Sequence, residues 1–357
     1  MWMTAFAQKD LEPEPSIHYC TEVFKILKGV EIEPFFELKK QMKAVQNPGN
    51  SIWRKITRIR THSTQVGKLT ANHKFNRYTD IVPYDHSRVV LKPTLNGSDY
   101  INASHIDITL NGRSYHFYAF QAPLEHTVDA FWTAIWQEGI SCMIKLTRNK
   151  ERGVNKCFEY VPFKGQASKL GDQGFSFRIA ADDCGSQITI TLLSIAEFPN
   201  ITVQLLRMSS EPPTDVLDDD TSSANSRPRT MYHTNISFHA WADHGVPAMP
   251  ELERLLYLNI NPVTAMPDID PRVHECLLRA AREQKHAVHC SAGVGRTGVL
   301  IVLLCMMYEA RQGCKEFNIA DCVDQMRDCR NTMVQTSDQF KCLYENAQVI
   351  LLNAIGD

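Results

Sequence analysis

The sequence has no long hydrophobic run and little net charge, and each absence argues against a class of protein. Its most apolar stretch, residues 298–308, covers about a dozen residues, whereas a membrane-spanning helix needs about 20. The formal net charge is only −2 over 357 residues, so no overall field favours nucleic acid or a membrane surface. We therefore expect no membrane span and no nucleic-acid partner, and any preference for anions must be local.

The sequence also lacks a signal peptide, a C-x-x-C pair and any cluster with the spacing of metal ligands. Its first residues, MWMTAFAQKDLEPEPS, have neither a basic start nor a long apolar run. The 11 cysteines are an odd number scattered through apolar segments, which indicates free thiols in a reducing compartment. We therefore expect a cytoplasmic protein that holds no metal and no cofactor.

The order of the elements indicates an α+β fold with a mixed, largely antiparallel central sheet surrounded by helices. Strands are expected at residues 100–108, 115–121, 140–147, 175–180, 187–194, 202–208, 231–241 and 286–289. Helices are expected at residues 15–45, 127–138, about 296–311, 317–330 and 336–353. Thr127 is placed to begin its helix and Gly139 to end it.

The chain is expected to form one domain over residues 51–357. Residues 1–50 are expected to be an N-terminal helical extension packed on that domain. Residues 209–230 are rich in Ser, Pro and Asp and nearly devoid of large apolar side chains. We predict a disordered surface insertion there, not a domain boundary, because the flanking strands have the length and pattern of a hairpin.

A cysteine stands six positions before an arginine three times in the chain, and two of these pairs do not suit a nucleophile. Cys142 lies in a predicted strand, and at full extension Arg148 is about 20 Å from it. Cys305 and Arg311 belong to a predicted helix, where about 100° per residue places them on different sides. Neither pair can hold one small anion, so we expect both thiols in the core.

The third pair, Cys290 and Arg296, flanks a short loop between a predicted strand and a predicted helix. Gly293 and Gly295 let this loop curl so that several backbone N–H groups point inward. The helix N-terminus adds partial positive charge, and the guanidinium can hold two oxygens of a phosphate. Both features lower the pKa of a thiol. The alternative is a glycine turn before a buried helix, with an incidental cysteine.

The segment VHCSAGVGRTG, residues 288–298, resembles the signature loop of the tyrosine-specific protein phosphatases. The similarity extends over about residues 70–350. Four more segments resemble motifs of the family, in the family's order: NRYTDIVPYDHSRV (76–89), DYINAS (99–104), WADHGVP (241–247) and QTSDQ (335–339). The resemblance implies a cysteine-based phosphatase of the non-receptor type, with residues 51–357 as its catalytic domain and a highly twisted central sheet.

The resemblance also assigns catalytic roles. Cys290 would attack phosphorus as a thiolate, and Asp243 would protonate the leaving phenolate and then activate water. Arg296 and the loop N–H groups would hold the phosphoryl oxygens, and so would any phosphate or vanadate in the site. The loop residues meant are Ser291, Ala292, Gly293, Val294 and Gly295. Thr297 would assist departure of the thiolate, and Gln335 and Gln339 would place the water. His289 would tune Cys290, unless His289 is a plain core histidine.

Substrates are expected to be phosphotyrosine-containing proteins or peptides, bound by a monomer. Tyr78 would sandwich the substrate ring, unless it is an ordinary surface aromatic. Asp80 would accept hydrogen bonds from the peptide backbone. Glu151 would brace Arg296, and Lys156 would approach the acid loop that begins at Trp241.

Some positions depart from the family pattern or leave alternatives open. The acid loop carries Ala242 and His244 where proline and phenylalanine are usual, which affects loop closure and pH sensitivity. The rival function is therefore a non-catalytic phosphotyrosine-binding module on the same fold. A dual-specificity or lipid phosphatase is disfavoured by the NRYTD segment. Arg327 and Arg330 form either a second anion site or a solvated helix face.

Overall fold

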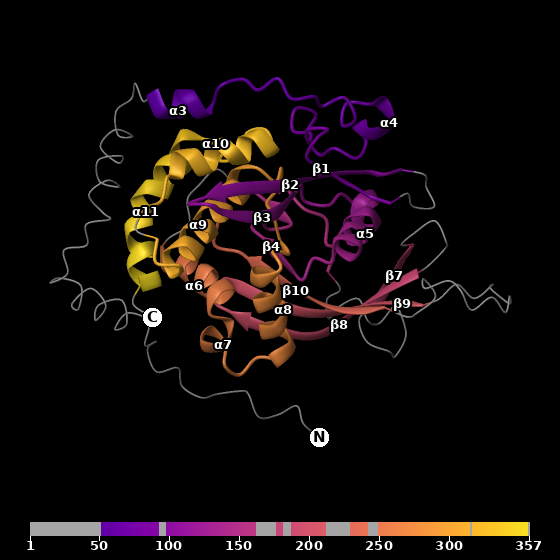
Figure 1. The fold of residues 1–357 in the computed structure, drawn as a ribbon. Coiled ribbons are helices and arrows are strands. Elements are labelled where there is room, and N and C mark those ends of the chain that lie inside the picture. The colour runs from indigo at the N-terminus through magenta and orange to yellow at the C-terminus, as the bar shows by residue number, and fades with distance from the viewer. Residues whose placement is uncertain are drawn as a thin grey trace.

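A computed structural model describes residues 51–92, 98–161, 176–180, 187–211, 229–241, 249–314 and 316–355 (Figure 1). The predicted helix over residues 15–45 and the extension over residues 1–50 lie outside the described residues. Most of the predicted insertion also lies outside the described residues. Its predicted edges are wrong, because β9 continues through Glu211 and β10 begins at Thr230, so residues 209–211 and 230 belong to paired strands. No helix in the described ranges is long and apolar enough to cross a membrane.

A nine-stranded sheet crosses the described part of the molecule (Figure 1). β11 lies near its middle and runs parallel to both neighbours, β3 and β4, and β4 is also parallel to β10. The other neighbours pair antiparallel, which confirms the predicted mixed sheet. In spatial order the strands are β1 (Arg88–Val90), β2 (Tyr100–Leu110), β3 (Arg113–Phe120), β11 (His286–His289), β4 (Cys142–Lys145), β10 (Thr230–Phe238), β9 (Ile201–Glu211), β8 (Gln187–Phe198) and β7 (Ser176–Ala180).

Helices flank this sheet, and a short hairpin of β5 (Lys150–Glu151) and β6 (Val154–Asn155) stands apart from it. α5 begins after Thr127 and ends at Gly139, whose φ of 65° is left-handed, so both predicted ends are confirmed. The described helices are α3 (Ser51–Ile56), α4 (Thr70–His73), α5 (Val128–Glu138), α6 (Met249–Ile260), α7 (Pro262–Ala265), α8 (Pro271–Arg282), α9 (Gly295–Arg311), α10 (Ile319–Cys329) and α11 (Ser337–Ile355), with a 3-10 turn at Glu125–Thr127.

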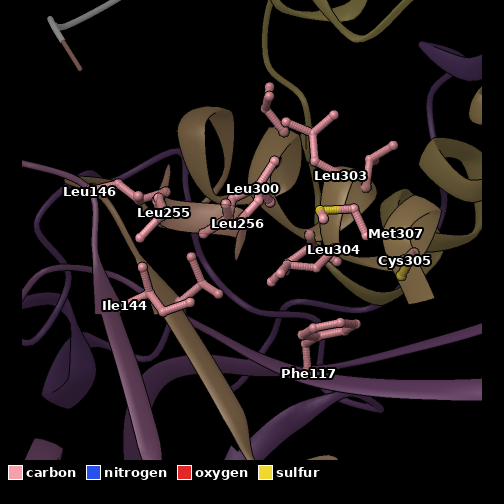
Figure 2. Close-up of a cluster of buried hydrophobic side chains, with 14 of the residues drawn as sticks. Phe117, Ile144, Leu146, Leu255, Leu256, Leu300, Leu303, Leu304, Cys305 and Met307 are labelled. Atoms are coloured by element: carbon pink, nitrogen blue, oxygen red, sulfur yellow. The ribbon is translucent and has the colours of Figure 1, made fainter. Parts of the chain in front are cut away.

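The two faces of the sheet bury separate hydrophobic clusters, as alternation along a strand requires. Ile144 of β4 belongs to the cluster under α6, α9 and α11, whereas its neighbour Met143 belongs to the cluster under α5. Figure 2 shows Leu300 of α9 beside Leu255 and Leu256 of α6, above Ile144. α9 is thereby packed between the sheet and the outer helices, and its first turn is buried.

Candidate active site

The three cysteines differ in their surroundings as the sequence predicts. Cys142 lies in β4 and Cys305 in α9, and both side chains are fully buried. Burial raises the pKa of both thiols well above the ordinary value. Cys290 instead follows the last residue of β11 and precedes α9, and its pKa is lowered.

The loop after Cys290 holds its shape because glycine occupies two crowded positions. Gly293 has a φ of 73°, and a Cβ atom there would lie 2.0 Å from the carbonyl oxygen of Phe120. A Cβ atom on Gly295 would lie 2.9 Å from the Gln339 side-chain amide. The loop therefore packs directly on the end of β3 and under the 335–339 segment.

Opposing effects set the ionisation of Cys290. Burial is the largest of them and favours the neutral thiol. The Arg296 charge, the Thr297 hydroxyl and the backbone N–H groups of Thr297 and Val294 together outweigh it, so the pKa falls below the ordinary value. Charge and dipoles at the start of α9 thus favour a thiolate, the form that acts as a nucleophile.

The pH dependence of alkylation reports this balance. We expect iodoacetamide to modify Cys290 with a midpoint below that of an ordinary thiol, because the thiolate is the reacting form. Replacing Thr297 by valine should raise the midpoint, since the hydroxyl that lowers the pKa of Cys290 is lost. Mass spectrometry of the Cys290 peptide measures the rate. An unchanged midpoint in T297V would contradict the contribution of the hydroxyl.

Arg296 is held by a bidentate ion pair with Glu151. Both Nη atoms lie 2.8 Å from the Glu151 carboxylate oxygens, and both side chains are almost fully buried. Nη1 also donates to the carbonyls of Leu146 and Trp241, at 2.8 and 3.0 Å. Burial favours the protonated Glu151, but the hydrogen bonds from Arg296 and Thr147 lower its pKa. Glu151 is thereby an ionised brace at neutral pH, in the position that the resemblance implies.

Arg330 lies against the back of the same loop, and the alternatives proposed for it are wrong. Its side chain is fully buried, so it belongs to no solvated helix face. Nε donates to the Gly293 carbonyl and Nη2 to the Ala292 carbonyl, each at 3.0 Å. The remaining bonds go to Ser104 Oγ at 3.0 Å and Asn102 Oδ1 at 2.7 Å. These donors face protein oxygens, which also excludes a second anion site built on Arg330.

Arg327 is likewise buried and bound to backbone. Nε and Nη2 donate to the carbonyls of Met333 and Val334, at 2.9 and 2.7 Å, and the guanidinium lies over the Trp53 ring. The predicted anion site and the solvated face therefore both fail for this residue. No local sequence pattern reveals these partners. Those of Arg330 lie on β2 and in the Cys290 loop, and those of Arg327 lie in the loop between α10 and α11.

We expect Arg330→Met to destabilise the fold by about 3 kcal/mol, because it leaves buried loop carbonyls and Asn102 without their donor. Equilibrium urea unfolding measures the change. Arg282→Met, which alters an exposed arginine of α8, is the matched control and should change stability by less than about 0.5 kcal/mol. Equal stability of the two variants would show that Arg330 does not brace the loop.

Asn102 carries this network on to the NRYTD segment. Its Nδ2 donates to Asn76 Oδ1 and to the Ile81 carbonyl, both at 2.8 Å. Asn76 Oδ1 also accepts from the Tyr100 hydroxyl at 2.6 Å. The segments 76–89 and 99–104 are therefore joined through Asn102 and Arg330 to the Cys290 loop in one hydrogen-bonded unit.

The described residues predicted to contact the substrate or the attacking water lie near this hydrogen-bonded unit. The Tyr78 hydroxyl is 2.9 Å from Ser291 Oγ, so the ring stands beside the loop, and Asp80 is exposed close by in sequence. Gln339 is buried, and its Oε1 accepts from the backbone N–H of Gln335 at 2.9 Å. The Lys156 carbonyl accepts from Ser291 Oγ at 3.1 Å. Asp243, His244 and Ala242 lie outside the described residues.

His289 contacts the backbone of the nucleophile and not its sulfur. Nδ1 lies 2.9 Å from the Cys290 carbonyl, and Nε2 lies 2.8 Å from the hydroxyl of Tyr160. Burial, the largest effect, lowers the pKa of the imidazole to about 3, so the ring is neutral. A neutral ring facing a carbonyl must donate from Nδ1, which leaves Nε2 as an acceptor beside the Tyr160 hydroxyl. That hydroxyl also lies 2.9 Å from Asn235 Oδ1, and the sequence alone reveals neither partner.

Comparison with known proteins decides the family. The family model for protein-tyrosine phosphatases matches residues 72–348. The chain belongs to the protein-tyrosine phosphatase family. Receptor-type tyrosine-protein phosphatase F of Danio rerio is 34% identical over 279 residues, which cover 78% of this chain and 12% of that protein. Tyrosine-protein phosphatase non-receptor type 2 of Mus musculus is 29% identical over 281 residues, covering 78% of this chain and 58% of that protein.

The family assignment confirms the resemblance read from the five motifs, and it confirms the α+β fold. The chain spans only part of these relatives, between about an eighth and three fifths of their length. Similar proteins of both the receptor type and the non-receptor type occur, so the non-receptor assignment stays a prediction.

Proposed function

We propose that this protein-tyrosine phosphatase domain hydrolyses phosphotyrosine in proteins through a phosphocysteine on Cys290. The observation that carries the proposal is a thiol of lowered pKa in the loop before α9, beside an arginine fixed by Glu151. In the first step the thiolate attacks phosphorus, an S–P bond forms, and the bond to the phenolate oxygen breaks. Arg296 and the N–H groups from Ser291 to Gly295 stabilise the charge on the phosphoryl oxygens.

Asp243 supplies the proton that the leaving phenolate takes up, and then accepts a proton from the attacking water. Gln335 and Gln339 position that water, and the Thr297 hydroxyl stabilises the departing thiolate. Support for this arrangement comes from the contact of Gln339 with the Gly295 position and from the effect of Thr297 on the sulfur. Water attack breaks the S–P bond and releases inorganic phosphate, which restores the free thiol.

Selectivity for phosphotyrosine follows from the depth of the site. Cys290 is only 5% exposed, and Tyr78 stands beside the loop with its hydroxyl at Ser291. A phosphorylated phenol can reach the sulfur past this ring and stack on it, whereas a phosphoserine is shorter. Asp80 would then bind backbone N–H groups of the peptide.

The test compares one phosphotyrosine peptide with its phosphoserine twin in buffer that contains a metal chelator. We expect a preference of at least about 10²-fold in kcat/KM for phosphotyrosine, and inhibition by vanadate. Phosphate release measures both rates. Equal turnover of the two peptides would contradict the role of Tyr78, and tight binding without turnover would favour the binding-module alternative.

We further propose that the domain acts as a monomer in the cytoplasm on phosphotyrosine-containing signalling proteins. The nine cysteines among the described residues are free thiols, which suits a reducing compartment.

A further inference from the structure

A pocket outside the phosphatase site opens at the start of β11, whereas Cys290 follows the end of that strand. Its volume is about 240 Å³, slightly below the roughly 300 Å³ of the smallest ordinary ligand pockets. β3, β11 and the C-terminal parts of α8 and α9 enclose it. The residues that matter for its chemistry are Tyr115, Phe117, Ala281, His286 and Tyr308.

Two polar atoms of the pocket residues are buried without a hydrogen-bond partner among the described residues: Nε2 of His286 and the hydroxyl of Tyr308. The other ring nitrogen of His286 bonds to the Ala280 carbonyl, and burial lowers the pKa of the ring to about 4. The imidazole is therefore neutral, and its Nε2 presents a lone pair. Buried polar atoms rarely stay unpaired, so both atoms need a partner that the described residues do not supply, either an ordered water or a polar group of a bound molecule.

The walls of the pocket are flat. The rings of Tyr115 and Tyr308 are nearly parallel, with an interplanar angle of 6° and centroids 6.2 Å apart. The rings of Phe117 and His286 lie 6.3 Å apart and tilted by 34°. Such surfaces favour a planar ring over a branched aliphatic group.

The charges at the pocket offset each other. Arg113 lines the pocket, and its Nη1 lies 3.5 Å from the carboxylate of Glu309. The same carboxylate accepts a hydrogen bond from the Tyr115 hydroxyl, so that polar group already has a partner. With its cation paired, the pocket offers no net field for an ion, so the occupant is expected to be uncharged.

We propose that this pocket binds a small, flat, uncharged aromatic molecule that carries one N–H or O–H donor, such as an indole or a phenol. The donor bonds to Nε2 of His286, and the ring packs against Tyr115 and Tyr308. The Tyr308 hydroxyl bonds a second polar atom of the ligand where one is present. The proposal does not depend on the phosphatase activity, because no residue of the pocket belongs to the catalytic loop.

The test uses 5-fluoroindole and ¹⁹F NMR on the full chain, with the phosphatase site saturated by vanadate. We expect saturable binding that vanadate does not displace. Ala281→Leu places a larger side chain in the pocket and should weaken binding at least tenfold. Arg282→Leu changes an exposed neighbour on α8 that does not line the pocket, and should bind as the native chain does.

A second set of measurements uses the native chain alone, so its outcome does not depend on whether a variant folds. It also identifies whether the bound aromatic ring belongs to a protein or to a free small molecule. 1-Methyl-5-fluoroindole lacks the donor and should bind at least several-fold more weakly to the native chain. Competition between N-acetyltryptophanamide and 5-fluoroindole distinguishes the two sources of the ring. If N-acetyltryptophanamide competes, the natural occupant is a protein side chain. If it does not compete, the occupant is a free small molecule. The proposal is overturned by the absence of saturable binding, by equal binding to Ala281→Leu, or by equal binding of the methylated probe.

Discussion

Replacing Cys290 by serine is expected to reduce kcat/KM for a phosphotyrosine peptide by about 10⁴-fold or more. The serine hydroxyl has the right size, but it stays protonated near neutral pH, whereas the lowered pKa of Cys290 increases the fraction of its thiol that is ionised. The loop N–H groups and Arg296 remain, so the variant should still bind phosphopeptide. Steady-state phosphate release and calorimetric binding separate the two effects.

Cys314→Ser is the matched control for this experiment. Cys314 is a free thiol of intermediate exposure after α9, bound to Arg113 and remote in sequence from the loop. Its replacement should leave kcat/KM within about twofold of the native value. Retention of substantial turnover in C290S, or its loss in C314S alone, would mean that the nucleophile has been assigned to the wrong thiol.

Arg296→Lys should have the second largest effect, a loss of about 10³-fold in kcat/KM. The bidentate pair with Glu151 and the bonds to two backbone carbonyls fix the planar guanidinium in one orientation. An ammonium keeps the charge but cannot reproduce two parallel N–H bonds at once. The loss should appear in both kcat and vanadate affinity, since each depends on oxyanion contacts.

Arg311→Lys provides the comparison, because it makes the same chemical change at the exposed end of α9. It should keep kcat/KM near the native value, although it weakens bonds to the Ile260 carbonyl and to Asn261. A similar loss in both variants would point to a general effect on α9. Native activity in R296K would show that a positive charge alone is sufficient to stabilise the phosphoryl oxygens, without two parallel N–H bonds from a planar guanidinium.

Local signals in the sequence were sufficient for the central elements. β11 occupies residues 286–289 as predicted, and α9 ends at Arg311. The glycines of the loop identified its curl because close backbone approach leaves no other residue type there. Missed elements also carried signals: α8 begins with Asp270 as its cap and Pro271 in its first turn, a pattern typical of a helix start.

The side-chain partners that could not be predicted from the sequence are long-range contacts. Arg330 follows α10 and adopts an extended backbone, with φ −147° and ψ 129°, so helical periodicity misplaces its side chain. Its partners on β2 and in the Cys290 loop are more than 35 residues away in the chain. The Tyr160 hydroxyl at His289 is equally remote. Such pairings depend on the packing of the whole domain, and no local pattern encodes them.

The central place of β11 has a consequence for how the domain loses activity. All four of its residues are buried, and parallel neighbours on both sides cover its backbone. Amide protons in such a strand exchange with solvent only when the surrounding sheet opens as a unit. We therefore expect the nucleophile to be attached to a slowly exchanging strand, so local fraying of the outer helices should leave its attachment intact.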